Sequence, residues 1–299
     1  MLGRSERWKE TSNIPFEPHT DFVNCTVSLI HMYQTANVLG KHFDGDYMIG
    51  FEFSGRDMAS GKRVMGIASA KSIGTTVISD PSKTWEIPDD WTLEDAATIP
   101  VVYLTAYNAL VVRGGLKPKQ KILIHSGSGG VGQASIRIAL SMNCEVFTTV
   151  GSDTKRDFLL KMFAELRPDH IGNSRSTSFE YMIAEMTNGD GVDMVLNSLA
   201  EDKLLASIRC LAVNGRFLEI GKYDLMNNSP IGLEILLKNV SVCGIVLEHV
   251  IGKEFSRTAA MVEEGMRNGI VKPLPTSVFV CDDSERAFRY MAQGKHIGK

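Results

Sequence analysis

The feature that most constrains the fold of this chain is a glycine-rich loop near its middle, between a strand-like apolar run and a helix-like pattern. The apolar run is Lys121–His125, and Gly127, Gly129 and Gly132 after it fit the spacing G-x-G-x-x-G. The first glycine permits the turn off the strand, the second lets the backbone approach a pyrophosphate, and the third lets the helix pack close to the sheet. Such a spacing alone is often only a tight turn. Here a helix N-terminus follows, with free N–H groups and a positive dipole end, so the loop predicts dinucleotide binding. The residues expected to hold the dinucleotide are Ser126, Gly127, Gly129, Gly130, Val131 and Gly132.

Around this loop, short apolar runs alternate with helical patterns, as in a parallel sheet covered by helices. Strands are expected at Lys121–His125, Cys144–Val150, His170–Gly172, Gly191–Asn197, Gly215–Ile220 and Val240–Leu247. Helices are expected at Val131–Met142, Thr154–Phe163, Phe179–Met186 and Lys203–Leu211. The region before them is mainly β, with strands expected at Val23–Leu29, Met48–Gly55, Gly61–Ala68, Val77–Ser79 and Lys83–Ile87. The fold class is therefore α/β, a Rossmann-type doubly wound parallel sheet plus a mainly β domain.

An apolar helix is expected to join the two domains. Thr92 is a plausible N-cap for a first helical turn, Ile99-Pro100 interrupts it, and Val101–Arg113 continues to a stop at Gly114-Gly115. We place the boundaries at 1–102 for the first part of the substrate-binding domain, 103–245 for the nucleotide-binding domain and 246–299 for the rest of the substrate-binding domain. The last part is expected to contain helices at Ser256–Asn268 and Ser284–Met291 with a strand at Ser277–Val280.

Composition excludes several classes of function. A net charge of −3 and a pI near 6.2 give no sign of a nucleic-acid or anionic-membrane surface. The five cysteines are scattered without metal-ligand spacing, which argues against a structural zinc site and fits a reducing compartment. No apolar run has the length of a membrane span, and the N-terminus lacks a signal-peptide core. We therefore expect a cytoplasmic protein without metal, nucleic-acid or membrane partners.

The type of dinucleotide is indicated after the second strand of the parallel sheet, where an acidic residue usually binds the ribose of NAD. Here Gly151-Ser152 is followed by Asp153, Lys155 and Arg156. Ser152 can donate to a 2′-phosphate and the two cations can neutralise it, so the segment favours NADPH, although Asp153 argues weakly for NAD. The alternative is that Ser152 and Asp153 cap a helix while Lys155 and Arg156 are solvated.

Two further strand ends carry candidate catalytic and cofactor-binding residues. Gly221 and Lys222 follow the strand that ends at Ile220, at the sheet edge where open α/β folds bind ligands, and a lysine there can donate a proton or polarise a carbonyl. Lys222 is otherwise a surface charge. Glu248 is either its partner or the edge of the preceding strand. Asn197-Ser198 is either a nicotinamide contact or part of a turn.

The helix between the domains carries Tyr103, Thr105 and Tyr107. Tyr103 is a candidate acid and Thr105 a candidate cofactor contact, whereas a packed core tyrosine is the more common outcome. His125, at the end of the first parallel strand, is expected to be structural.

Several motifs together resemble the zinc-free medium-chain dehydrogenase/reductase superfamily. They are Gly50–Asp57, Val101–Tyr107, His125–Gln133, Thr149–Ser152, Asn197–Ala200, Leu218–Lys222 and Met291–Lys299. The resemblance is greatest to the enoyl reductase domains of animal type I fatty acid synthases and related polyketide synthases, and it extends from about Gly50 to Lys299.

The resemblance implies a GroES-like substrate-binding domain and an NADPH-dependent reduction of trans-2-enoyl thioesters, with hydride added to the β-carbon and a proton to the α-carbon. It implies proton donors in the Glu-Ile-Gly-Lys motif and after the next strand, which are Lys222 and Glu248 here. The family has Asp where this chain has Glu248. The implied partners are an acyl carrier protein with its phosphopantetheine arm, other domains of a multifunctional fatty acid or polyketide synthase, and a second copy in a homodimer.

Three departures from the family keep alternatives open. Met32–Val38 replaces an Asn-Phe-Arg-Asp stretch near the substrate cleft, Asn108 replaces a tyrosine, and the chain stops at Lys299 where the family continues into another strand, as a segment of a larger polypeptide would. The alternatives are a reductase-like module that binds NADPH or supports a synthase dimer with little or no activity, and a stand-alone quinone or enone reductase.

Overall fold

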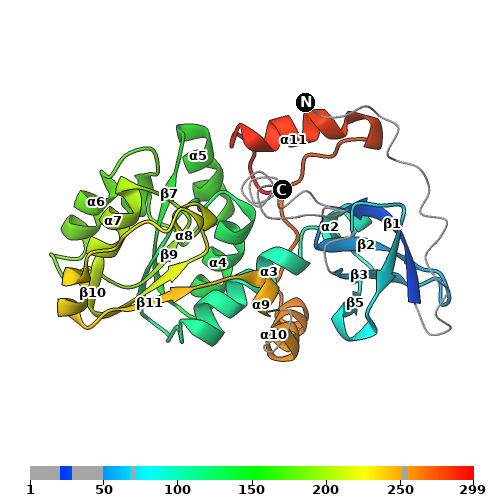
Figure 1. Cartoon of the computed structure of the whole chain (residues 1–299), viewed down its shortest axis with the longest axis horizontal. Helices are drawn as coiled ribbons and strands as arrows, with labels where there is room; N and C mark the ends of the chain where they lie inside the picture. The colour runs from blue at the N-terminus through cyan, green and yellow to red at the C-terminus, as the bar shows by residue number, and fades with distance from the viewer. Residues whose placement is uncertain (1–20, 29–49, 69–71, 251–254) are drawn as a thin grey trace.

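A computed structural model describes residues 21–28, 50–68, 72–250 and 255–299 of the chain, and it contains two sheets (Figure 1). The smaller sheet is antiparallel, in the order β4-β1-β2-β3-β5. Its strands are β1 (Asp21–Ser28), β2 (Glu52–Asp57), β3 (Arg63–Ile67), β4 (Thr76–Ser79) and β5 (Thr84–Glu86). These match the β segments expected before residue 90. Met32–Val38 lies outside the described residues.

The larger sheet is parallel, in the order β11-β10-β9-β6-β7-β8. Its strands are β6 (Lys121–Ile124), β7 (Glu145–Val150), β8 (Ile171–Asn173), β9 (Val192–Asn197), β10 (Leu211–Glu219) and β11 (Ser241–Gly244). Taken from β6 onward, this is the 3-2-1-4-5-6 order of doubly wound dinucleotide-binding folds, and the strand order reverses between β6 and β9. The predicted α/β class is confirmed.

Helices cover both faces of the parallel sheet because successive strand residues point to opposite faces. Ile122 and Ile124 lie in the core shared with α3 (Pro100–Tyr107) and α4 (Gly130–Ser141), whereas Leu123 lies in a second core. That second core also holds residues of α6 (Phe179–Met186) and α7 (Asp202–Arg209). The α5 helix (Asp153–Met162) follows β7, on the first face.

The helical stretch between the sheets is largely buried. The α2 helix (Leu93–Ala96) begins with a capping box in which Thr92 and Asp95 bond each other's backbone N–H groups, so the predicted N-cap is confirmed. Every residue of α3 is buried, and the stretch continues as a π-helical turn, η2 (Asn108–Arg113). Together Leu93–Arg113 span 21 residues at a mean hydropathy of 1.3, enough by length and composition to cross a membrane, contrary to our expectation of no such run. Their burial identifies them as a core helix.

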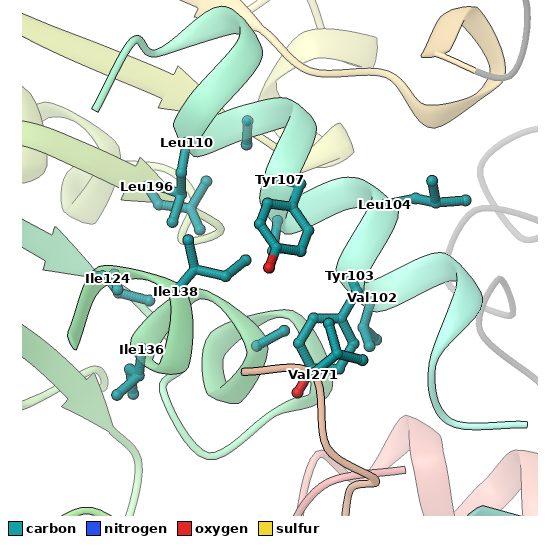
Figure 2. Packing of buried hydrophobic residues seen from close by; sticks show 14 of the residues in the cluster. Val102, Tyr103, Leu104, Tyr107, Leu110, Ile124, Ile136, Ile138, Leu196 and Val271 are labelled. Carbon is teal, nitrogen blue, oxygen red and sulfur yellow. The ribbon is translucent and has the colours of Figure 1, made fainter. Parts of the chain in front are cut away.

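Figure 2 shows the packing around α3. In this view Leu110, Tyr107 and Leu196 of β9 lie above Ile138 of α4, while the ring of Tyr103 lies beside Val271. The α10 helix (Phe255–Arg267) also contacts α3. The core therefore joins the parallel sheet to segments from both ends of the chain.

Two strand predictions were wrong in the C-terminal part. The expected strand Val240–Leu247 ends at Gly244 because its partner β10 ends at Glu219, and the chain then enters the short helix α9 (Leu247–His249), which contains Glu248. Ser277–Val280 forms no strand, and its Val278 and Val280 side chains are exposed. Valine favours strands, but this preference needs a backbone partner and a packed face to be expressed. The helix α11 (Ser284–Ala292) follows as expected.

Candidate active site

The glycine loop joins β6 to α4 at the point where the strand order reverses. The left-handed residue of the turn is Ser126, with φ 55°, rather than Gly127 as the spacing suggested. Gly127 is required for another reason: a Cβ atom there would lie 2.1 Å from the Thr148 hydroxyl on β7. A Cβ atom at Gly132 would lie 2.4 Å from the Ser126 carbonyl oxygen, so α4 packs directly on the loop. Side chains at Gly127 and Gly132 would therefore collide with neighbouring atoms, and we call the loop from Ser126 to Gly132 the glycine cradle.

The end of the chain lies against this cradle. The N–H of Gly298 donates to the carbonyl of Ser128 at 2.9 Å, and Gly298 forms a β-bridge with Gly129. Gly129 is the N-cap of α4 and has no side chain to satisfy the N–H groups of the first turn. Gly130 and Val131 begin the helix, so the cradle has the polarity that suits a pyrophosphate.

The end of β7 carries a cluster of cations. Ser152 caps α5 by accepting a hydrogen bond from the Lys155 N–H, which is the helix-capping role considered as the alternative for this serine. The Arg156 guanidinium donates to the carbonyls of Ile171 and Pro168, at 2.6 and 2.7 Å. Lys155 donates to the carbonyl of Gly294 at 2.7 Å.

Arg175 is a residue of this cluster that sequence reasoning missed. A Cβ atom on Gly151 would lie 2.9 Å from its Nε atom, so the guanidinium lies directly over Gly151. Burial lowers the pKa of Lys155, and the nearby positive charge of Arg175 lowers it further because two cations repel each other. The available signal was topological: Arg175 follows the third parallel strand, which pairs with β7, so both strand ends reach the same edge.

The ends of β9 and β10 form a hydrogen-bonded network. The Asn197 amide nitrogen donates to Oε2 of Glu219 at 2.6 Å and to the Leu199 carbonyl at 2.7 Å. The N–H of Gly221 donates to Oε1 of Glu219 at 2.5 Å. The Ser198 hydroxyl lies 3.0 Å from that of Ser126, which connects this network to the glycine loop. Asn197 thus makes the turn contacts considered above, and Glu219 is a second residue missed from the sequence.

Lys222 is the first residue of α8 (Lys222–Met226), with Gly221 as its N-cap, and it is half-buried. Glu248 lies in α9, shortly after β11. Because β10 and β11 are parallel neighbours, both residues lie at the carboxyl edge of the sheet. The two candidate proton donors therefore occupy the same edge as the glycine loop.

The residues of the helix α3 are packed rather than exposed. Tyr103 is fully buried, and its hydroxyl donates to the Lys272 carbonyl at 2.9 Å and accepts from the Lys272 N–H at 3.0 Å. Burial raises the pKa of Tyr103 and that of Tyr107, the latter to about 12, which makes both phenols weaker acids. Thr105 is 9% exposed.

His125 is buried between two hydroxyl groups. Its ring nitrogens lie 2.9 Å from the Thr149 hydroxyl and 2.8 Å from that of Ser207. Burial lowers its pKa to about 3, so the ring is neutral, as a structural residue would be. Within the described part of the chain, no group of three or more His, Cys, Asp or Glu side chains could hold a metal ion.

Comparison with known proteins assigns the chain and its fold to a family. The family model described as zinc-binding dehydrogenase matches residues 130–264. The highly reducing polyketide synthase frbB of Dothideomycetidae sp. is 42% identical over 71% of this chain, which spans only 8% of that protein. Polyketide synthase 37 of Dictyostelium discoideum is 36% identical over 87% of this chain, which spans 10% of that protein. The chain therefore spans about a tenth of the length of these curated relatives.

Solved structures agree with this assignment. The CurK enoyl reductase has a TM-score of 0.83 and 28% identity, covering 93% of this chain and 89% of its own. A chain assigned as an enoyl reductase domain of a polyketide synthase is 35% identical with a TM-score of 0.52, covering 60% of this chain and 98% of its own. A mycobacterial protein complexed with NADPH has the same fold, with a TM-score of 0.80 at 23% identity. The chain belongs to the medium-chain dehydrogenase/reductase superfamily, whose members use NAD(P)H, and it is an enoyl reductase domain of the polyketide synthase type.

Proposed function

We propose that this domain reduces trans-2-enoyl thioesters with NADPH as part of a polyketide or fatty acid synthase. One observation carries the proposal. The glycine cradle, the cation cluster and Lys222 all lie at the carboxyl edge of the parallel sheet. When bound, NADPH supplies the hydride that adds to the β-carbon of the thioester and leaves as NADP⁺. The protein's part is to bind, to orient and to deliver one proton to the α-carbon, which completes the saturation of the double bond.

The cradle and its neighbours would hold the cofactor. Ser126, Gly127, Gly129, Gly130, Val131 and Gly132 would surround the pyrophosphate, and Thr105, Asn197, Ser198 and Gly221 would line the nicotinamide side. In support, the cradle fits only glycine at Gly127 and Gly132, where a Cβ atom would collide with neighbouring atoms.

We propose that Lys155 and Arg175, which lies over Gly151, bind the 2′-phosphate together with Ser152. In support, these two cations are close enough for Arg175 to lower the pKa of Lys155, and an anion between them would relieve that repulsion. Arg156 contributes by holding the neighbouring backbone, since its guanidinium already bonds two carbonyl groups.

An affinity comparison tests the phosphate site. Arg175→Ala removes a charge-assisted contact and should weaken NADPH binding by about 10- to 100-fold while changing NADH binding much less. Arg167→Ala is the matched control, because Arg167 is an exposed arginine of the same domain that pairs with Asp169. Equal weakening of NADPH and NADH by Arg175→Ala would contradict the assignment.

The proton donors are proposed as Lys222 and Glu248, which follow neighbouring parallel strands. We propose a packing role for Tyr103, since both hydrogen-bonding capacities of its hydroxyl are used by the Lys272 backbone. The assay is thioester-dependent NADPH oxidation by the purified domain, with a trans-2-enoyl pantetheine or acyl-carrier-protein thioester, followed at the nicotinamide absorbance band.

Three substitutions make this assay specific. Lys222→Ala and Glu248→Gln should lower turnover and leave NADPH affinity largely unchanged, whereas Lys117→Ala, an exposed lysine at the opposite edge of the sheet, should change neither. Unaltered turnover in the double variant of Lys222 and Glu248 would remove both from the mechanism. Oxidation of NADPH with free quinones but with no thioester would favour the stand-alone reductase instead.

We also propose that the domain pairs with a second copy through the edge strand β11. In support, this edge and its surroundings expose large apolar side chains on Val213, Leu233, Leu237 and Val242. A charge at the edge, Val242→Lys, should shift the molar mass measured by light scattering from that of a dimer to that of a monomer. A wild-type domain that is monomeric at high concentration would contradict this pairing.

A further inference from the structure

The network at the ends of β9 and β10 contains one buried acid that the proposed chemistry does not use. Glu219, the last residue of β10, is 4% exposed, and its two carboxylate oxygens each accept one short hydrogen bond. The donors are the side-chain amide of Asn197 at 2.6 Å and the backbone N–H of Gly221 at 2.5 Å.

These two donors determine which form of Glu219 fits. An amide NH₂ group and a backbone N–H donate and do not accept, and a carboxylate offers each of them an oxygen with free lone pairs. In a protonated acid the oxygen that carries the proton is a weaker acceptor, so one of the two hydrogen bonds would be weakened. The two contacts therefore fit the ionised side chain better than the protonated one.

The same carboxylate connects the parts of the site that have to act together. Through Asn197, whose Oδ1 accepts from the Leu199 N–H at 3.2 Å and whose amide also donates to the Leu199 carbonyl, it fixes the turn that presents Ser198. Through Gly221 it fixes the N-cap of α8, and hence the backbone that carries Lys222. Ser198 in turn reaches Ser126 of the glycine loop.

We propose that the ionised carboxylate of Glu219 is a positioning group for the reductase, holding the Asn197–Ser198 turn and the Gly221–Lys222 backbone in their working arrangement. The proposal rests on the reductase function proposed above. It assigns Glu219 no contact with substrate. It predicts that protonation of this one side chain loosens the site and lowers turnover.

The surroundings place this protonation in the neutral range. Burial raises the pKa of Glu219 to about 7, opposed by the hydrogen bonds from Asn197 and Gly221 and assisted by the charge of Asp224. The neighbouring strands place Asn197 and Gly244 opposite Glu219, neither of them charged. Among the described residues of α8, the charged ones are Lys222 and Asp224. Below about pH 7 the carboxylate takes up a proton and one of its hydrogen bonds is weakened.

The first test is the pH profile of turnover at saturating substrates for the wild-type domain and for Glu219→Gln. The wild type should lose turnover on an acid limb with a midpoint near 7. Glu219→Gln, which has one acceptor oxygen for two donors, should show no such limb and should lower kcat about tenfold or more at pH 8. KM for the thioester and the Kd for NADPH should change less than threefold. Glu185→Gln on α6 makes the same chemical change at an exposed site and should keep the wild-type profile.

The second test needs no catalysis. In a ¹⁵N-labelled domain, the amide proton of Gly221 should titrate with a midpoint near pH 7, and this titration should be absent in Glu219→Gln and present in Glu185→Gln. A Gly221 resonance that is independent of pH between 5 and 9 would overturn the network. Dispersed spectra of both variants confirm that they fold.

The two tests separate this inference from the proposed function. If the wild type shows no thioester-dependent oxidation while Gly221 titrates as expected, the reductase function fails and the ionised network stands. If the wild type turns over and Glu219→Gln keeps the wild-type acid limb and kcat, the positioning role is refuted.

Discussion

The buried ion pair between Glu52 and Lys299 gives the sharpest prediction about stability. Glu52 lies at the start of β2 in the antiparallel sheet, and Lys299 lies 247 residues later beside the glycine loop. Their side chains are 1% and 6% exposed, with Nζ 2.5 Å from Oε1. The other oxygen of Glu52 accepts the N–H of Val101 at the start of α3, at 2.9 Å. One carboxylate therefore ties the antiparallel sheet to the start of α3 and to Lys299.

The expected loss of stability follows from the burial of both side chains. Burial raises the pKa of Glu52 and lowers that of Lys299, so each side chain depends on the charge of the other to remain ionised. Breaking a buried pair by removing one partner leaves an uncompensated buried charge and costs about 3–5 kcal/mol. Removing both partners leaves no such charge, so the double variant should lose well under the sum of the two single losses.

The measurement is a double-mutant cycle in urea. Glu52→Gln, Lys299→Met and the double variant are unfolded while tryptophan fluorescence is followed, and the coupling free energy between the two sites should be about 2 kcal/mol or more in favour of the pair. The matched control is the Lys62–Glu86 pair, whose side chains are 59% and 69% exposed, so Glu86→Gln should cost only about 0.2–1 kcal/mol. Additive losses in the buried cycle, or equal losses at the two pairs, would refute this reasoning.

Three further predictions concern the glycine cradle, the core tyrosine and the buried acid. Gly127→Ala should abolish measurable NADPH binding, because its Cβ atom would lie 2.1 Å from a hydroxyl on β7, whereas Gly232→Ala, with open space around it, should bind normally in a fluorescence titration. Tyr103→Phe should lower the free energy of unfolding by about 1–3 kcal/mol through the loss of two buried hydrogen bonds and leave kcat unchanged; a large loss of kcat would restore the tyrosine as an acid. Glu219 keeps its proton in the folded state up to a pKa of about 7, whereas the unfolded chain releases it near 4.5, so stability should fall by about 3 kcal/mol as pH rises from 4.5 to 7. In urea titrations over this pH range, Glu219→Gln should lose less stability than the wild type, and an identical fall in both would contradict the assignment.

Most of the fold could be predicted from local patterns in the sequence. The alternation of apolar runs and helical patterns predicted the parallel sheet, and the N-cap expected at Thr92 marked the start of the helical stretch between the sheets. Errors fell in the C-terminal part, at Gly244 and at Ser277–Val280, where strand formation depends on where a partner strand ends or on whether a face of the segment is packed. Such information is not local, so no window of sequence contains it.

Only part of the candidate site could be predicted from the sequence. The sequence by itself determined the glycine loop, the candidate lysine and the edge at which they meet, because spacing and chain order specify a turn and a strand end. Only the tertiary structure decided which side chains meet at that edge, namely Arg175 over Gly151 and Glu219 between Asn197 and Gly221, and which ones pair near the glycine loop, namely Glu52 with Lys299. It also showed that the hydroxyl of Tyr103 makes two hydrogen bonds with the Lys272 backbone. The physical reason is that hydrogen bonds and charge interactions act over a few ångströms in space, between residues that the sequence separates by up to hundreds of positions.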